Sequence, residues 1–296
     1  MMRKLVWVCF LGVIGGWFPL SALCGEYPTQ FHRGGGNDRP ENTLETFLWA
    51  WEMGVAPEAD VRLTKDGVPI AFHDNELNRL GRHFPESWRD VPVAQLTWEQ
   101  LQNVDVGSYL NPRYAAQRIA PMTDVFAAMK EDPRRMLYLD EKGATPQRMA
   151  QMSKEYGVQS QVIFASPNRH LLVEWKKLAP EGKAMLWVPS WNVPDEKVDA
   201  FLWERLEKLA ADGFPSIDII QIHVYTDLSK PDPFKPSSAM LKRVASLLKE
   251  NGIHFQAISW SQGDRPETYR KLMELGVQSF ATDHPQPCLE AIRSEK

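Results

Sequence analysis

The sequence predicts an α/β fold, the (β/α)8 or TIM barrel, in which eight parallel strands alternate with helices. Apolar segments of strand length recur along the chain, and amphipathic segments of helical length separate them. Eight such strands can be counted, centred near residues 31, 59, 137, 163, 186, 220, 256 and 280. Eight βα units in roughly 250 residues match the usual size of this barrel. A doubly wound open sheet is the alternative arrangement of the same units.

The first 24 residues have the features of an export signal. Arg3 and Lys4 form a short positive start, residues 5–20 form an apolar run, and small residues follow at 22 and 24. Cys24 would also suit a lipoprotein, but Leu23 before it fits that processing badly. We therefore expect a signal peptide at 1–24, a single domain at 25–296, and an exported protein that is periplasmic or extracellular.

Charge and cysteine content narrow the classes of partner. The chain has 34 basic and 38 acidic residues, and loss of the leader removes two of the basic ones. A mildly acidic chain does not favour nucleic-acid binding, which rewards basic patches. Of three cysteines only Cys288 survives cleavage, so an intrachain disulfide is not expected. We also expect no stable membrane insertion after cleavage of the signal.

The first unit begins with a strand at residues 30–33, followed by a glycine-rich loop at 34–38. Residues 40–43 are expected to open a helix, with Asn37 or Asp38 as its cap and Pro40 in its first turn. Gly54 marks its end.

Residues 58–74 are expected to form two strands around a turn at 65–67. Because side chains alternate along a strand, Glu58, Asp60 and Arg62 share one face. Two carboxylates roughly 6–7 Å apart along a strand are costly to bury unless a positive charge lies between them. A hard divalent cation would supply that charge, although two solvated acids on an exposed face would also explain the pattern.

Regular alternation follows. We expect a short helix at 97–103 and another at 121–130, and then six strand and five helix segments. The strands are 136–139, 162–165, 184–188, 217–224, 254–259 and 279–282, and the helices are 145–156, 169–178, 198–211, 237–251 and 267–275.

Polar residues gather where these strands end, which is where the active site of such a barrel lies. Glu58, Asp60 and Asp140 would supply three oxygen ligands to one cation, with positions left for substrate and water. His32 and His73 suit proton transfer near neutral pH. Two cationic side chains, Arg33 and Lys142, suit a phosphate group. The set predicts metal-assisted cleavage of a phosphate ester.

An ordered series of motifs resembles the glycerophosphodiester phosphodiesterase family. It spans nearly all of the chain after the leader. The series is His32-Arg33-Gly34, Pro40-Glu41-Asn42-Thr43, Glu58-x-Asp60-Val61, Thr64-Lys65-Asp66-Gly67, His73-Asp74, Asp105-Val106-Gly107-Ser108, Asp140-x-Lys142 and Thr282-Asp283-His284-Pro285.

The resemblance implies a barrel of the phospholipase C-like phosphodiesterase type that binds one Mg²⁺ or Ca²⁺. The implied cation ligands are Glu58, Asp60 and Asp140, the implied acid and base are His32 and His73, and the implied phosphate-binding residues are Arg33 and Lys142. The implied reaction splits a glycerophosphodiester into glycerol 3-phosphate and an alcohol. A glycerol hydroxyl attacks phosphorus while a histidine protonates the leaving alcohol, and water then opens the cyclic phosphate. We expect His73 to be the acid of the first step and His32 its base.

Two departures from the family pattern leave the substrate open. Asp140 stands where the family usually has Glu, so a shorter side chain has to reach the cation. Residues 258–261 read Ile-Ser-Trp-Ser where the family has Trp-Thr-Val-Asn. The leaving alcohol therefore stays open. A lipid phosphodiesterase resembling phospholipase D toxins and a binding protein without turnover are the alternative functions.

Overall fold

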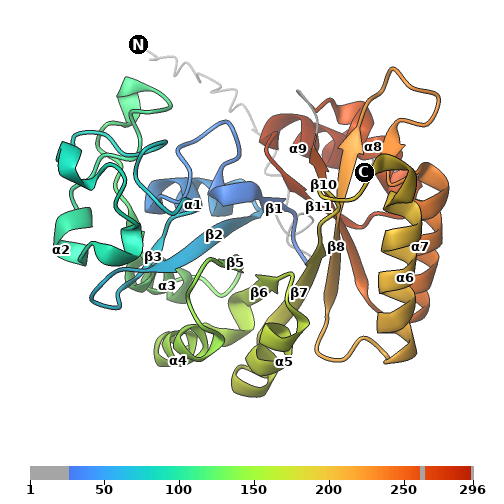
Figure 1. The fold of residues 1–296 in the computed structure, drawn as a ribbon, viewed down its shortest axis with the longest axis horizontal. Coiled ribbons are helices and arrows are strands. Elements are labelled where there is room, and N and C mark those ends of the chain that lie inside the picture. The colour runs from blue at the N-terminus through green and yellow to red at the C-terminus, as the bar shows by residue number, and fades with distance from the viewer. Residues whose placement is uncertain (1–26, 261–263, 295–296) are drawn as a thin grey trace, which may run out of the picture.

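The computed structural model describes residues 27–260 and 264–294, so the predicted signal peptide lies outside the described residues. Eight parallel strands form a closed barrel (Figure 1), because β1 pairs with both β2 and β11. This closure confirms the predicted TIM barrel and shows that the open-sheet alternative is wrong. In order around the barrel, the strands are β1 (Gln30–Phe31), β2 (Ala56–Leu63), β5 (Leu137–Glu141), β6 (Val162–Ser166), β7 (Lys183–Val188), β8 (Ile219–Thr226), β10 (His254–Trp260) and β11 (Ser279–Thr282).

Helices surround the barrel (Figure 1). They are α1 (Leu44–Glu52), α3 (Met122–Lys130), α4 (Pro146–Tyr156), α5 (Arg169–Leu178), α6 (Val198–Ala211), α7 (Ser238–Glu250), α8 (Pro266–Glu274) and α9 (Pro285–Ser294). Helix α9 was not predicted; its prolines at 285 and 287 lie in the first turn, where a missing amide proton costs no helical hydrogen bond. Within the described part of the chain, no helix combines the length and apolar character needed to cross a membrane.

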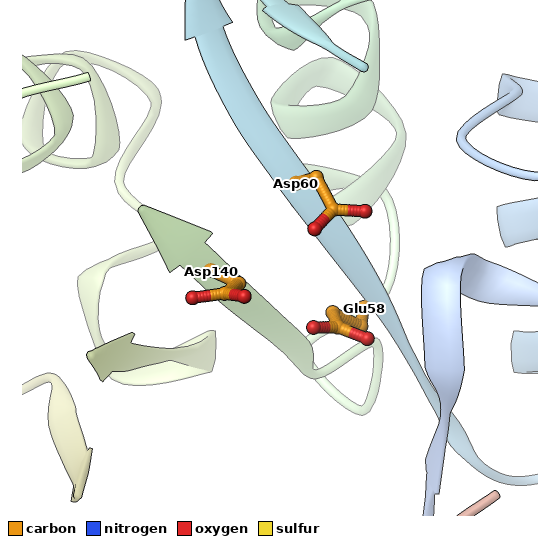
Figure 2. Close-up of side chains that lie close together, drawn as sticks. All are labelled: Glu58, Asp60 and Asp140. Carbon is orange, nitrogen blue, oxygen red and sulfur yellow. The ribbon is translucent and has the colours of Figure 1, made fainter. Parts of the chain in front are cut away.

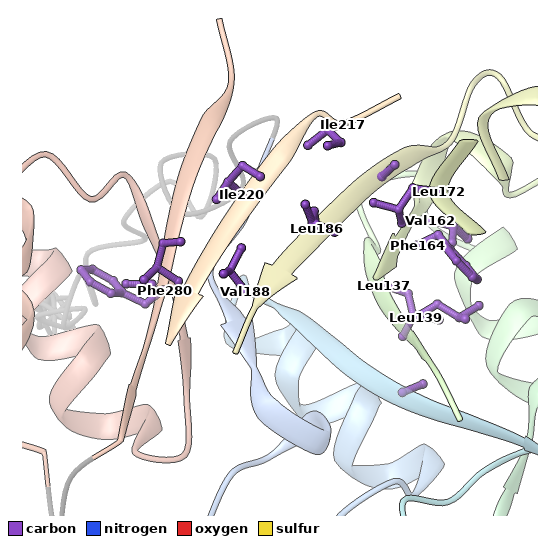
Figure 3. Packing of buried hydrophobic residues seen from close by; sticks show 14 of the residues in the cluster. Leu137, Leu139, Val162, Phe164, Leu172, Leu186, Val188, Ile217, Ile220 and Phe280 are labelled. Carbon is purple, nitrogen blue, oxygen red and sulfur yellow. The ribbon is translucent and has the colours of Figure 1, made fainter. Parts of the chain in front are cut away.

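Alternation along the strands separates two layers. Leu137 and Leu139 of β5 belong to the large core between barrel and helices (Figure 3). Tyr138, between them, belongs to a smaller cluster inside the barrel. Residues of the same parity as Tyr138, including Asp140, therefore face the barrel interior. This geometry decides which side chains of each strand can reach a central site.

The first helix starts later than expected. Leu44 is its first residue and the Thr43 hydroxyl caps it by accepting a hydrogen bond from the Thr46 amide. The residue before the cap, Asn42, has a φ of 57° and so cannot be part of the helix. The predicted start at Pro40 and the predicted caps Asn37 and Asp38 are therefore wrong.

A long excursion between β2 and α3 forms a layer of its own beside the barrel (Figure 1). It contains β3 (Pro69–Ala71), α2 (Trp98–Leu101), β4 (Ala120–Pro121) and the 3-10 helices Glu86–Trp88, Val93–Gln95 and Pro112–Tyr114. Its separate core includes Ile70, Phe72, Leu77 and Leu101. Since β3 is antiparallel to β2, the chain returns after β3 towards the barrel strands and carries His73 with it.

Candidate active site

Three buried acidic side chains lie together inside the barrel (Figure 2). Glu58 and Asp60 project from β2, and Asp140 projects from the adjacent β5, in register with Asp60. One carboxylate oxygen of each lies within 4.8 Å of the others. The structure therefore brings together the three residues predicted to bind a cation.

Some carboxylate oxygens of this cluster accept hydrogen bonds from surrounding groups, and others accept none. The Arg33 amide donates to Glu58 Oε2 at 3.0 Å, and the Asn42 side chain donates to Asp60 Oδ2 at 2.8 Å. Lys142 Nζ donates to Asp140 Oδ2 at 2.6 Å and lies 3.6 Å from Asp60 Oδ1. The Oδ1 atoms of Asp60 and Asp140 are buried and accept no hydrogen bond from the described residues. Buried oxygens without donors are suited to a hard divalent cation.

The electrostatics of the cluster show why it favours an added positive charge. Burial, together with the negative charges of Glu58 and Asp60, raises the pKa of Asp140 to about 7, against the opposing effect of Lys142. Burial also acts to raise the pKa of Asp60, but the positive charges of Lys142 and Arg33 and the hydrogen bond from Asn42 outweigh it and lower that pKa. Asp140 is thus less able than Asp60 to ionise without a cation. The shorter carboxylate still reaches the site.

His32 follows β1 in a 3-10 turn, His32–Gly34, and lies beside the acidic cluster. Its Nδ1 donates to Asp283 Oδ1 at 2.7 Å, and its Nε2 lies 3.8 Å from Glu58 Oε2. Burial would lower the pKa of His32, but the negative charges of Glu58 and Asp283 raise it to about 9. Asp283 thus contacts a site residue, whereas the turn after β11 is capped by Thr282, whose hydroxyl accepts from the His284 amide.

His73, the second histidine, contacts the Arg33 side chain. The Arg33 guanidinium can only donate, so His73 Nε2, at 3.1 Å from Nη2, accepts this hydrogen bond. His73 Nδ1 lies 2.7 Å from Asp74 Oδ1 and donates to it. This pattern assigns the proton of His73 to Nδ1 and leaves Nε2 unprotonated, as the acceptor of the bond from Arg33.

A network behind Arg33 and His73 was only partly foreseen from the sequence. Glu41 accepts from Arg33 Nη1 at 3.2 Å and from two nitrogens of Arg79 at 2.7 and 2.8 Å. Arg79 also donates to both oxygens of Asp74, at 2.7 and 2.9 Å. Glu41 therefore contacts the site through Arg33. Arg79 lies in none of the motifs noted in the sequence, and its bond to Glu41 spans 38 residues of the chain.

Two of the carboxylates, Glu58 and Asp140, line a cavity of about 170 Å³ together with His32 and His73. Its other side is aromatic, formed by Trp187, Trp191, His223 and Trp260. His223 lines this cavity, and its Nδ1 also accepts a hydrogen bond from Trp260 Nε1 at 3.0 Å.

Comparison with known proteins identifies the family. Residues 32–287 match the family model described as the glycerophosphoryl diester phosphodiesterase family. A glycerophosphodiester phosphodiesterase of Caldanaerobacter subterraneus subsp. tengcongensis is 26% identical over 271 residues, covering 88% of this chain and 96% of the relative.

Solved structures share the fold. A putative glycerophosphoryl diester phosphodiesterase of Silicibacter pomeroyi has a TM-score of 0.68 at 20% identity, with coverage of 93% of this chain and 98% of its own. An Oleispira antarctica phosphodiesterase, solved in complex with the product sn-glycerol 3-phosphate, has a TM-score of 0.65 at 23% identity, with coverage of 90% and 97%. The chain therefore belongs to the glycerophosphoryl diester phosphodiesterase family and is a phosphoric diester hydrolase.

Proposed function

We propose that this protein hydrolyses glycerophosphodiesters to glycerol 3-phosphate and an alcohol by acid and base catalysis with two histidines. The observation that carries the proposal is the convergence of Glu58, Asp60 and Asp140 beside a cavity that His32 and His73 line. Carboxylates that are buried together need a cation, and a phosphodiester needs both a proton donor and a proton acceptor. A small-molecule diester is the proposed partner, consistent with a cavity of about 170 Å³.

The proposed cofactor is one divalent cation, Mg²⁺ or Ca²⁺, held by the three carboxylates. Such an ion would polarise a phosphoryl oxygen and favour ionisation of a hydroxyl bound beside it. The chain's own cationic groups complement this effect. Arg33 presents a planar guanidinium and Lys142 an ammonium at the edge of the same cavity, where both can contact phosphate oxygens.

The hydrogen bonds support an order of proton transfer opposite to the one expected from the sequence. His32, with its raised pKa, carries a proton on Nε2 and suits the acid. His73, whose Nε2 is unprotonated and accepts from Arg33, suits the base. His73 takes the proton of the attacking glycerol hydroxyl as the new O–P bond forms. His32 gives its proton to the alcohol oxygen as the old P–O bond breaks. In the second step water gives a proton to His32, and His73 returns its proton to the ring oxygen that leaves.

Hydrolysis assays test the function. Purified protein is incubated with glycerophosphocholine, sphingomyelin or lysophosphatidylcholine, with and without EDTA. Release of glycerol 3-phosphate from glycerophosphocholine that chelation abolishes is the expected result. Activity on the lipids alone would replace the proposal with the lipid phosphodiesterase, and no turnover with any metal would leave the binding protein.

A substrate with a good leaving group separates the roles of the two histidines. p-Nitrophenolate leaves without protonation, so His32→Gln should lose about 100-fold or more with glycerophosphocholine but much less with glycerophospho-p-nitrophenol. His73→Gln should lose activity on both substrates. If His73→Gln is the variant rescued by the nitrophenyl substrate, the assignment from the sequence is the right one.

We also propose that the protein is exported and processed after residue 24. The composition of the leader supports this, since a positive start, an apolar run and small residues occur in that order. Intact mass of the protein recovered from the periplasm or culture medium tests it. A mass that includes residues 1–24 would contradict it.

A further inference from the structure

The aromatic side of the cavity lies directly across the barrel from the acidic cluster. Around the ring of eight strands, β8 is four strands from β2 in either direction, and β10 is four strands from β5. Glu58 and Asp60 on β2 therefore face His223 on β8, and Asp140 on β5 faces Trp260 on β10. A diester whose phosphate lies at the acidic cluster has room to extend one arm towards the aromatic side.

His223 connects this aromatic wall, which we define as Trp187, Trp191, His223 and Trp260. The centroid of its ring lies 5.5 Å from that of Trp187, 5.3 Å from Trp191 and 5.6 Å from Trp260. Trp191, at 53% exposed, is one of the large apolar side chains that the described fold leaves open to solvent. The wall therefore combines the packed rings around His223 with the solvent-exposed ring of Trp191.

The polar atoms of the wall are donors. His223 Nδ1 already accepts from Trp260, so in the neutral ring the remaining nitrogen carries the proton. Burial, together with the positive charges of His32 and Lys142, lowers the pKa of His223 to about 3, so the ring is neutral. Indole nitrogens also only donate. Among the described residues lining the cavity the carboxylates are Glu58 and Asp140, and both lie on the other side.

These properties select one kind of alcohol. Ring faces attract a cation through their quadrupole, but a wall of donors offers no hydrogen-bond acceptor to the N–H groups of a primary ammonium. A fully methylated ammonium carries the charge without any N–H. The hydroxyls of glycerol, in contrast, are oxygen ligands of the kind that a hard cation prefers, so the glycerol arm suits the acidic side.

We propose that Trp187, Trp191, His223 and Trp260 form a subsite for a quaternary ammonium group on the leaving alcohol. This inference rests on the proposed function and names its substrate class. Trp260 also links the subsite to the acid, because its ring lies 5.5 Å from that of His32 in an edge-to-face contact. An alcohol held along Trp260 places its ester oxygen beside His32.

Trp191→Leu tests the subsite directly, since an exposed ring can be removed with little effect on folding. We expect the ratio of kcat/KM for glycerophosphocholine to that for glycerophosphoglycerol to fall by roughly 5- to 30-fold, as expected for loss of a cation–π contact. Trp203→Leu, on the outer helix α6, is the matched control and should leave the ratio unchanged. An unchanged ratio in Trp191→Leu would overturn the subsite.

Binding without turnover separates this inference from the proposed function. Choline and its uncharged isostere 3,3-dimethylbutan-1-ol are titrated against the wild-type protein, with tryptophan fluorescence as the readout. Choline should bind several-fold more tightly, and Trp191→Leu should reduce the difference. Equal binding of the two would overturn the subsite even if glycerophosphodiesters are hydrolysed. Preferential binding of choline without hydrolysis of any glycerophosphodiester would support the subsite and reject the proposed function.

Discussion

Asp140 is the residue of the acidic cluster whose ionisation costs the folded protein stability. Its carboxyl is buried, has one oxygen bonded to Lys142 and another without a hydrogen bond, and its pKa is raised to about 7 by burial and by Glu58 and Asp60. A carboxyl that is harder to ionise in the folded than in the unfolded chain binds more protons when folded. It therefore reduces stability progressively as pH rises from about 4, the usual range of an aspartate, to about 7.

Asp140→Asn should remove this loss of stability and also remove activity. In EDTA, the free energy of unfolding of the variant should fall less between pH 5 and pH 8 than that of the wild type, because an amide does not titrate. Hydrolysis should fall at least about 100-fold, since a proposed cation ligand is lost. Denaturant unfolding at the two pH values measures the first effect. Glu141→Gln is the control, because the Glu141 side chain accepts a hydrogen bond from the exposed Gly143 amide and does not belong to the cluster. An identical pH dependence of unfolding in Asp140→Asn and wild type would contradict the prediction.

Arg79 acts on the site through other residues, as a positioning residue. It is bound to Glu41, which holds Arg33, and to Asp74, which orients His73. Arg79→Ala should lower kcat about 10- to 100-fold, because Arg33 and His73 lose the anions that fix them. Arg79→Lys, which keeps the positive charge but lacks the planar guanidinium, should retain only part of the wild-type kcat.

Steady-state kinetics that separate kcat from KM distinguish this role from a merely structural one. In Arg79→Ala kcat should fall by a larger factor than KM rises, since the Asp74 carboxylate that orients the His73 ring loses its partner. Arg89→Ala removes an exposed pair with Glu86 on the same excursion and should change neither constant. Wild-type kcat in Arg79→Ala would contradict the role of Arg79.

Among the structural elements, the turn after β1 does most to shape the site. Arg33 has a φ of 52° and Gly34 a φ of 89°, so the chain reverses directly after the strand. The reversal directs the Arg33 amide at Glu58 and places the His32 ring between Glu58 and Asp283. A side chain at Gly34 would begin 2.6 Å from the ring of Phe47, which belongs to the main core.

Gly34→Ala should therefore lower both stability and activity. Gly67→Ala is a matched control, because Gly67 has a similar φ of 78° but nothing within 4 Å of the added carbon. Left-handed backbone alone should cost about 1–2 kcal/mol in either variant. The clash at Gly34 should add about 1–3 kcal/mol and reduce hydrolysis. Equal losses of stability in the two variants, measured by denaturant unfolding, would show that Phe47 does not constrain the turn.

At the scale of the whole molecule, the closed barrel is what holds like charges together. Glu58, Asp60 and Asp140 repel one another, and the packing of the strands resists their separation. A cation that binds the folded chain and not the unfolded one shifts the equilibrium towards the folded state.

Addition of cation should therefore raise the melting temperature of EDTA-treated protein. At a concentration about 100 times the Kd the gain is about 2.7 kcal/mol, which corresponds to roughly 5–10 °C for a chain of this size. Parallel titrations with Mg²⁺ and Ca²⁺, followed by thermal unfolding, identify the preferred ion. Asp140→Asn should show little of this shift, and a full shift in that variant would place the cation elsewhere.

The sequence by itself determined the barrel and the residues of its acidic cluster. Alternation along β2 and β5 fixes which side chains face inward, and the recurrence of eight βα units favours a barrel, whose closure the pairing of β1 with β2 and β11 then shows. The predictions for His32, Arg33, Glu58, Asp60, His73, Asp140 and Lys142 needed only strand parity, strand ends and family-like spacing. The structure places six of these residues around one cavity and Asp60 beside Asp140 and Lys142.

Tertiary structure alone decided how these residues are held and charged. The bond of Asp283 to His32 and the bond of Arg79 to Glu41 join segments that are far apart in the chain. A pattern of spacing carries no information on such contacts, because they depend on where loops meet in space. The protonation of the two histidines is of this kind, since burial and neighbouring charges set it, and these exist only in the folded chain.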